Sequence, residues 1–411
     1  MSFTCFDELD QHIRKSIMPF QENIENLYRK NFSKVLAAFQ SNKVASHHLH
    51  PSFGYGLMDG GTQAVEGVFS SLFCSEASIV RPQLVTGTQA LYLILKTFLR
   101  QGDTLLCLCG APYETLQACI GIQQGTEGNN LCAQGIRYRE VNLIDQNFEI
   151  PQLLEADDSV KILWIQKSCG YGPRRSISNQ EIRTWLPSLR EIYPQAIIAV
   201  DNCYGELVED TEPIEIGADL CAGSLLKNLG GGIAKTGAYI TGKKLLVEAC
   251  ADMLVAPGMG FETLPNLGFT GSFLQGLFLS PLVVRESLLG NLYMSCFMQE
   301  MGFKVDPSYQ DPHYDIVLKI ATQDKSHWQH FANALQSSSP LDSYVTPEAF
   351  EQKGYPSPII MAGGTFTTGS SIEFSVDGFA SDPYYMYYQA GMVAEQSAIL
   401  ARALFARFNK A

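Results

Sequence analysis

The chain has 411 residues, of which 46% are hydrophobic and 17% charged, and its formal net charge is −13 at pH 7. The apolar fraction excludes disorder as the dominant state, and the length predicts two or three domains of about 100–200 residues each. The 42 acidic residues outnumber the 29 basic ones. A chain of this charge repels a phosphate backbone, so nucleic acid is not an expected partner.

The longest apolar stretch, near residues 276–284, is short and is interrupted by Pro281. A membrane-spanning helix needs about 20 apolar residues, so no membrane partner is expected. The N-terminal segment MSFTCFDELDQHIRK alternates charged with apolar residues and lacks the core of a signal peptide. The 11 cysteines are scattered and mostly lie in apolar runs, which is typical of reduced thiols. We therefore expect a cytoplasmic protein.

Spaced apolar residues over 6–42 predict one or two amphipathic helices, and a glycine-rich connection follows at 54–61. From about residue 64, short apolar runs alternate with helical patterns. Strands are predicted at 104–109, 135–141, 161–166, 196–201, 220–224 and 237–241. Helices are predicted at 88–100, 113–122, 178–193 and 243–254. This alternation favours right-handed crossovers and a mostly parallel sheet with both faces covered.

The pattern loosens past about residue 260. A long helix is predicted at 273–301, a strand at 314–320, a helix at 326–335, strands at 359–362 and 371–376, and a terminal helix at 384–408. These elements indicate a second, smaller α/β domain. The expected division is residues 1–54 for N-terminal helices and an arm, 55–260 for the large domain and 261–411 for the smaller one.

The segment from Asp201 to Lys227 carries the most informative chemistry. Asp201 ends an apolar strand, so its carboxylate is expected at the carboxyl edge of the sheet, where open α/β folds bind ligands. Lys227 follows the next strand and precedes three consecutive glycines. A lysine beside a buried carboxylate suits pyridoxal phosphate chemistry. The amine forms a Schiff base with the cofactor aldehyde, and the carboxylate keeps the pyridine nitrogen protonated.

Further cofactor contacts can be assigned to nearby positions. Gly87, Thr88 and Gln89 begin an apolar helix, whose free N–H groups and positive dipole end would hold a phosphate. Ser224 lies three residues before the lysine, and its hydroxyl can reach the same phosphate. Tyr113 follows another predicted strand and would present its ring at the same edge, ready to stack on the pyridine.

These motifs resemble those of fold type I pyridoxal-phosphate enzymes, and among them the methionine gamma-lyase-like family often labelled aluminium-resistance proteins. The resemblance runs from about residue 54 to 408. Its most specific motifs are VRPQLVTGT at 80–88, DNCYGE at 201–206, GADL at 217–220, AGSLLKN at 222–228, QGLFL at 275–279, VTPE at 345–348 and GTFTTGSSIE at 364–373. It implies a mostly parallel sheet of the seven-stranded type in a large domain, with a smaller α/β domain following it.

The resemblance also implies roles for individual residues. Lys227 is the Schiff-base lysine, Asp201 the pyridinium partner and Tyr113 the stacking aromatic, and the phosphate cup consists of Gly87, Thr88 and Ser224. It further implies a homotetramer built from dimers, with Tyr55 near the cofactor of the neighbouring subunit.

The sequence departs from the family pattern where larger polar or basic residues are usual. Leu57, Thr62, Gln89 and Cys169 stand where tyrosine, arginine, histidine and arginine are usual. Glu373 stands where cystathionine-type enzymes carry an arginine for the substrate carboxylate. A glutamate repels an α-carboxylate, so Arg174 or Arg175 becomes the better candidate for that role.

Other motif matches predict no site. Ser224 and Lys227 also fit the Ser-x-x-Lys pattern of serine β-lactamases, but the chain has no Ser-Asp-Asn, and Lys235 is too close for the third motif. The histidines at 47, 48 and 50 and those at 327 and 330 lack cysteine or carboxylate partners at a recognisable spacing. Zinc needs three or four converging ligands, so no metal is expected.

The leading hypothesis is a pyridoxal-phosphate-dependent lyase that acts on a sulfur-containing amino acid by β- or γ-elimination. Lys227 would remove the α-proton, and Tyr113 would protonate the departing thiolate. Two alternatives remain. One is another reaction of the same cofactor, such as γ-replacement, racemisation or transamination, which needs the same residues. The other is a non-catalytic binding or regulatory protein, which the departures from the family pattern motivate.

Overall fold

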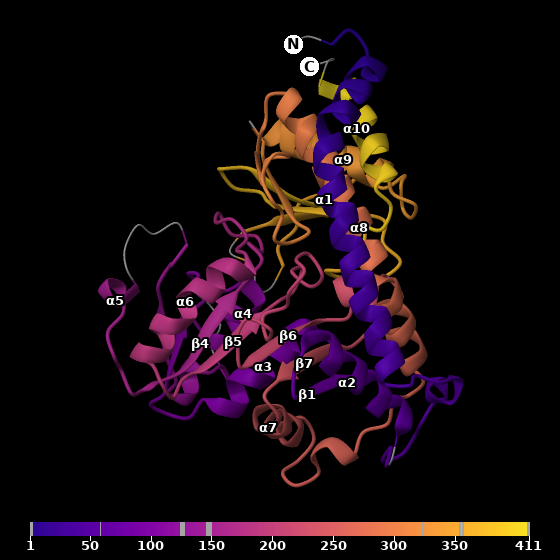
Figure 1. Ribbon diagram of the computed structural model, residues 1–411. Helices are drawn as coiled ribbons and strands as arrows, with labels where there is room; N and C mark the ends of the chain where they lie inside the picture. The colour runs from indigo at the N-terminus through magenta and orange to yellow at the C-terminus, as the bar shows by residue number, and fades with distance from the viewer. Residues whose placement is uncertain are drawn as a thin grey trace.

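The computed structural model describes residues 3–57, 59–123, 128–144, 150–322, 324–352, 355 and 357–408. A seven-stranded sheet and a separate five-stranded sheet form its two halves. Helices α1 (Phe6–Ser41) and α8 (Thr270–Glu300) pack against each other and run alongside both halves (Figure 1). The domain boundaries expected at residues 54 and 260 stay predictions.

The seven-stranded sheet has the order β1-β7-β6-β5-β4-β2-β3. Strand β7 runs antiparallel to both its neighbours, and the remaining pairs are parallel. The expected mostly parallel sheet is therefore confirmed. Its strands are β1 (Ala77–Arg81), β2 (Thr104–Cys107), β3 (Arg137–Glu140), β4 (Val160–Gln166), β5 (Ile197–Asp201), β6 (Leu220–Ser224) and β7 (Ala238–Gly242).

Several of the helices associated with this sheet begin at side-chain caps. The hydroxyl of Thr86 accepts a hydrogen bond from the N–H of Gln89, and Ser178 and Glu181 form a reciprocal capping box. The helices and short 3₁₀ turns of this part are η1 (Ser46–Leu49), α2 (Gly60–Phe73), α3 (Gly87–Phe98), α4 (Glu114–Ile120), η2 (Cys132–Gln134), α5 (Ile150–Leu153), α6 (Asn179–Ile192), η3 (Asn228–Gly230), α7 (Lys244–Leu254) and η4 (Gly260–Glu262).

The register of the parallel strands brings their carboxyl ends together. Gln166 at the end of β4 pairs with Asp201 at the end of β5, and Asp201 pairs with Ala222 in β6. These strands are buried along nearly their whole length, because helices cover both faces of a parallel sheet. The side chains that follow the strand ends therefore share one edge of the sheet.

The five-stranded sheet is antiparallel throughout, with the order β10-β11-β12-β9-β8. Trp328 and Phe331 of α9 are fully buried in the core of this half. Its elements are β8 (Lys304–Asp306), β9 (Leu318–Ala321), α9 (Lys325–Ser337), β10 (Ile359–Ala362), β11 (Ser375–Phe379), β12 (Tyr385–Gln389) and α10 (Glu395–Phe408).

The predicted terminal helix at 384–408 is wrong over its first half. Tyr385–Gln389 is strand β12, which pairs with β11 and β9, and α10 begins only at Glu395. The segment is rich in aromatic residues, which suit a strand, and Gly391 has a positive φ of 76° that interrupts any helix.

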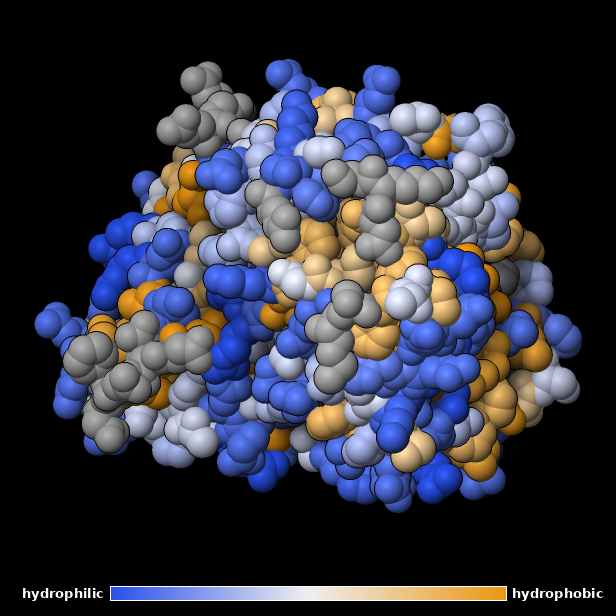
Figure 2. All heavy atoms as spheres, turned by 90° about the horizontal axis from the view of Figure 1, so that it is seen from above, coloured by the Kyte–Doolittle hydropathy of each residue, from blue (hydrophilic) through white to orange (hydrophobic). Residues whose placement is uncertain are grey.

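The two long helices differ in how much of them is buried. The N-terminal segment forms one continuous helix, α1, with a buried stripe that includes Leu9, Ile13 and Ile17. Helix α8 is buried on most sides, which explains its nearly uniform apolar sequence. No helix in the described ranges is long and apolar enough to cross a membrane. Seen from above, the surface is largely hydrophilic with smaller hydrophobic patches (Figure 2).

Candidate active site

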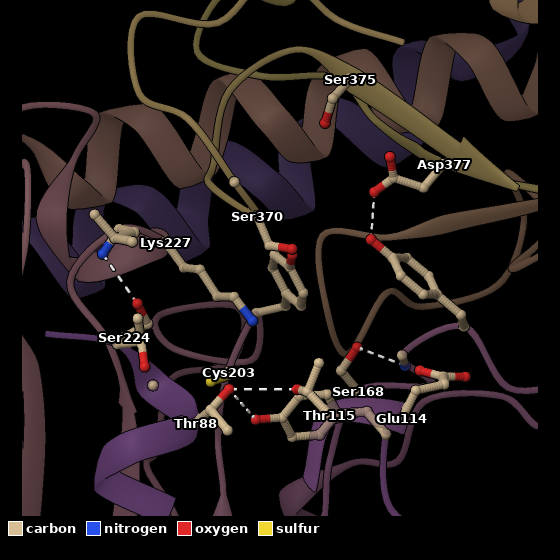
Figure 3. Close-up of a pocket in the computed structure, with 18 of the residues that line it drawn as sticks. Thr88, Glu114, Thr115, Ser168, Cys203, Ser224, Lys227, Ser370, Ser375 and Asp377 are labelled. Carbon is tan, nitrogen blue, oxygen red and sulfur yellow. Dashed lines mark hydrogen bonds between the residues drawn. The ribbon is translucent and has the colours of Figure 1, made fainter. Parts of the chain in front are cut away.

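A cavity of about 540 Å³ lies at the carboxyl edge of the large sheet. One wall consists of residues that follow β5 and β6 and of the first turn of α3. The facing wall comes from the smaller half, with β11 and the loop that follows β10. Figure 3 shows Thr88, Cys203, Ser224 and Lys227 together with Ser370, Ser375 and Asp377 around this space.

Lys227 lies directly before η3, and its side chain lines the cavity. Its ammonium nitrogen is 3.7 Å from the centre of the Tyr204 ring, which is a cation–π distance. Burial works against the charge on this lysine, but the neighbouring Cys203, Tyr204 and Asp201, of which Asp201 is a carboxylate, raise the pKa of its amine above the ordinary value. The amine is therefore charged at neutral pH while it faces these groups.

Asp201 is the last residue of β5 and is 2% exposed. One carboxylate oxygen accepts a hydrogen bond of 3.0 Å from the backbone N–H of Cys203. Burial raises the pKa of the carboxyl, whereas the charge of Lys227 and the hydrogen bond from Cys203 lower it. A buried carboxylate and an amine thus line one cavity.

The start of α3 lies close against β6. A Cβ atom at Gly87 would be 3.0 Å from the Cβ of Ser224 and 3.3 Å from the Sγ of Cys203, so only glycine permits this approach without displacement. Gly87, Thr88 and Ser224 all line the cavity. Helix N-termini that face a cavity favour anions, because N–H groups and the helix dipole point at the ligand.

Tyr113 forms another part of the same wall. Its hydroxyl donates a 2.7 Å hydrogen bond to the Oγ1 of Thr88, and its backbone N–H donates to the side chain of Gln166 at 2.8 Å. Burial and the charge of Asp201 raise the pKa of the phenol, so it stays protonated at neutral pH. One hydrogen bond fixes the hydroxyl of Tyr113 and the other fixes its backbone, so the ring is held in one orientation, as stacking on a cofactor requires.

Gln89 and Tyr55 do not line the cavity. The side chain of Gln89 accepts a hydrogen bond from the N–H of Val85 and donates one to the carbonyl of Gln83, so it closes the turn before α3. Tyr55 is 69% exposed and lies in the glycine-rich connection. Within this protomer neither residue contributes to the site.

Arg174 and Arg175, the residues expected to bind the substrate carboxylate, do not line the cavity. The guanidinium of Arg174 donates hydrogen bonds to the backbone carbonyls of Gln166, Ser168 and Arg175. Arg175 forms an ion pair with Glu181 at 2.6 Å. Both side chains therefore stabilise the loop after β4 and the start of α6.

Sequence reasoning missed the contribution of the smaller half. Asp377 of β11 and Tyr171 both line the cavity, and the phenol of Tyr171 donates a hydrogen bond to Oδ2 of Asp377. Burial raises the pKa of Asp377 to about 6. A single aspartate in an alternating strand carries no local signal, so only the packing of the two halves reveals it.

Glu373 does not face the cavity. It is 3% exposed and accepts a 2.6 Å hydrogen bond from the N–H of Phe366, which ties down the loop beside the site. In the described part of the chain, no group of three or more histidine, cysteine, aspartate or glutamate residues is arranged to hold a metal ion.

The residues present fit pyridoxal phosphate. The amine of Lys227 and the buried carboxylate of Asp201 line one cavity, and the helix start at Gly87 has no Cβ to obstruct a phosphate group. Lys227 would hold the cofactor aldehyde, Asp201 would face its ring nitrogen, and Tyr113 would cover the ring.

Comparisons with known proteins agree with this geometry. The uncharacterized protein YnbB of Bacillus subtilis is 38% identical over 382 residues, which cover 92% of this chain and 91% of YnbB. A Listeria monocytogenes structure, named as a candidate cystathionine beta-lyase involved in aluminum resistance, is 37% identical with a TM-score of 0.93. The match covers 98% of this chain and all of that one.

More distant structures share the fold alone. The pyridoxal-5′-phosphate-dependent protein YhfS from Escherichia coli is 15% identical, with a TM-score of 0.61 over 93% of this chain and 97% of that one. The architecture is thus that of fold type I pyridoxal-phosphate enzymes, as expected. The family model described as methionine gamma-lyase matches residues 6–408. The chain belongs to the methionine gamma-lyase family.

Proposed function

We propose that the protein is a pyridoxal-phosphate-dependent carbon–sulfur lyase that acts on a sulfur-containing amino acid, by elimination at the β or γ carbon. The observation that carries this proposal is that the amine of Lys227 and the buried carboxylate of Asp201 line one cavity. Membership of the methionine gamma-lyase family and the name of the Listeria relative support the same reaction class.

Pyridoxal phosphate, when bound, supplies an electrophilic aldehyde and a ring that accepts electrons from the α carbon. This chain would bind its phosphate at Gly87, Thr88 and Ser224, where α3 begins against β6. Asp201 would keep the ring nitrogen protonated, since a buried carboxylate gains most from a cationic partner. The ring of Tyr113 would prevent the cofactor from tilting.

The proton transfers are assigned to two side chains. The amine of Lys227, once neutral, removes the α-proton of the substrate. Tyr113 stays protonated at neutral pH because burial raises the pKa of its phenol, so it is able to donate a proton to the departing thiolate. Thr88, whose hydroxyl accepts from Tyr113, holds the phenol in place.

We also propose that the active form is a homotetramer built from dimers, in which Tyr55 reaches the cofactor of a second copy. The strong exposure of Phe53, Tyr55 and Leu57 supports this, because neighbouring large apolar side chains are commonly covered by a partner. Sedimentation of the wild type and of Tyr55→Ala tests the proposal. A wild type that sediments as a monomer contradicts it.

The cofactor is tested by the visible absorption spectrum before and after borohydride, followed by peptide mass mapping. We expect a yellow band that bleaches and leaves a pyridoxyl mass on Lys227. Lys227→Ala should lose both, whereas the control Lys244→Ala, whose side chain is 66% exposed, should keep them. A colourless protein that stays colourless with added cofactor contradicts the proposal.

The reaction type is tested by product analysis with thioether amino acids. Elimination gives a 2-oxo acid, ammonia and a thiol in equal amounts. Three other outcomes indicate another reaction of the same cofactor. A new thioether indicates γ-replacement, a D-amino acid indicates racemisation, and a requirement for an amino-group acceptor indicates transamination. Bound cofactor with no turnover of any amino acid supports a binding or regulatory role instead.

A further inference from the structure

We propose that Asp377 makes the cavity selective for thioether amino acids whose side chain ends in a cationic group, such as a primary ammonium. This inference rests on the lyase function proposed above and assigns its substrate class. It concerns the wall formed by the smaller half, opposite the proposed cofactor residues.

Asp377 lies on β11 and lines the part of the cavity where we expect the substrate side chain. The residue is 8% exposed and lines the same cavity as Lys227. Figure 3 shows the side chain of Lys227 running from the left of the view to its centre and Asp377 at the right, with the Asp377 carboxylate linked to the Tyr171 hydroxyl. The other carboxylate oxygen, Oδ1, accepts no hydrogen bond from any residue that the structure describes. A buried carboxylate with one free oxygen is a ready acceptor for a ligand donor.

No positive charge of the described chain faces this carboxylate. Lys227 is the single lysine or arginine among the described residues that line the cavity, and it lies against Tyr204. The groups around Asp377 are the phenols of Tyr171, Tyr204 and Tyr355, whose pKa values burial raises, so they are neutral. Glu114 adds a second carboxylate to the cavity lining. Among the residues that the structure describes, this part of the cavity is acidic and has no counter-ion.

A cationic group on the substrate supplies the positive charge that the described residues of this wall lack. An ammonium pairs with the free oxygen of Asp377, and the faces of Tyr171 and Tyr355 add cation–π attraction. A side chain that ends in a carboxylate is repelled, and one that ends in a methyl group leaves the charge unpaired. A hydrogen bond to a charged group changes kcat/KM by about 10–100-fold.

The test uses the cofactor-loaded enzyme and two thioethers of equal length, S-(2-aminoethyl)cysteine and S-propylcysteine. We expect the amine to have the higher kcat/KM by at least about 10-fold. Asp377→Asn should bring the ratio of the two values close to one. Ser375→Ala, on the same strand and also in the cavity wall, is the control and should keep the ratio. An equal or reversed preference in the wild type overturns the inference and leaves the lyase function standing.

A binding measurement separates the two proposals. Lysine and 2-aminoheptanoic acid have matching lengths and cannot undergo elimination of a thiol. Calorimetry should show tighter binding of lysine to the wild type and no difference with Asp377→Asn. If neither thioether is cleaved, the lyase function fails, and this comparison still decides the selectivity for charge. Equal binding of both amino acids to the wild type contradicts the role of Asp377.

Discussion

The two walls of the cavity are built on different principles. The wall of the large sheet places Asp201 and Lys227 at the ends of parallel strands, where the register of β5 and β6 sets their positions. The wall of the smaller half places Asp377 within an antiparallel strand, where it depends on how two halves pack. In the function and selectivity proposed above, the large sheet carries the reaction chemistry and the smaller sheet selects the substrate.

A buried tryptophan packs beneath each wall of the cavity. Trp164 lies in β4 beside the strand that ends in Asp201, and it is 1% exposed. Trp328 of α9 is fully buried beneath β11, where a Cβ at Gly378 would be 2.6 Å from its indole nitrogen. Gly378 directly follows Asp377, so the indole supports the strand that carries the carboxylate.

Replacing each tryptophan by alanine separates the two walls. Trp164→Ala and Trp328→Ala should each lower the free energy of unfolding by about 3–5 kcal/mol, because a large buried side chain leaves a cavity. Chemical denaturation measures this loss. Trp164→Ala should also weaken cofactor binding, whereas Trp328→Ala should reduce the preference for the amine substrate. If both variants lose the same property, the division between the walls is wrong.

Asp201→Asn removes the carboxylate of the large-sheet wall and retains its shape. We expect kcat to fall about 10²–10³-fold, since a preorganised charge beside the reacting system is lost. The substrate preference should stay unchanged, because Asp377 is untouched. Steady-state kinetics with both thioethers measure the two effects, and Asp158→Asn, at an exposed loop, is the control. A change in preference without a fall in kcat contradicts the assignment.

Most of the large-sheet wall could be predicted from the sequence. Parallel strands bring their carboxyl ends to one edge, so the residues after each apolar run had to meet there. Lys227, Asp201, Tyr113 and Gly87 do line one cavity. Gln89 lies in the same segment, but its amide bonds to the backbone of its own turn, which spacing alone does not reveal.

The other wall could not be predicted in the same way. The aromatic residues of β12 were assigned to a helix, because a short apolar run fits either element when its neighbours are unknown. Asp377 and Tyr171 are far apart in the chain and meet only through packing of the two halves. The placement of Arg174 could not be predicted either, since its guanidinium bonds to backbone carbonyls, which leave no pattern in the sequence.

Asp377 also predicts how stability depends on pH. Burial raises its pKa from 3.8 to about 6, so the folded protein holds this proton more tightly than the unfolded chain. The contribution to stability is therefore present below about pH 4 and is lost as the pH rises through 6. Between pH 4.5 and 8, the wild type should lose on the order of 2 kcal/mol relative to Asp377→Asn. Denaturation of both proteins at the two pH values measures the difference, and a larger loss in the variant contradicts the unpaired carboxylate.

Tyr113→Phe has the smallest expected effect and tests a single hydrogen bond in the large-sheet wall. The ring stays in place, while the 2.7 Å hydrogen bond to Thr88 is lost. A neutral hydrogen bond contributes about 0.5–1.5 kcal/mol, so cofactor affinity should fall by about 2–10-fold. If the phenol also protonates the leaving thiolate, kcat should fall further for thioethers with poor leaving groups than for those with good ones. Tyr138→Phe, which removes a phenol that bonds to Glu140 and does not line the cavity, is the matched control. An equal loss of kcat across all leaving groups would assign the phenol to positioning alone.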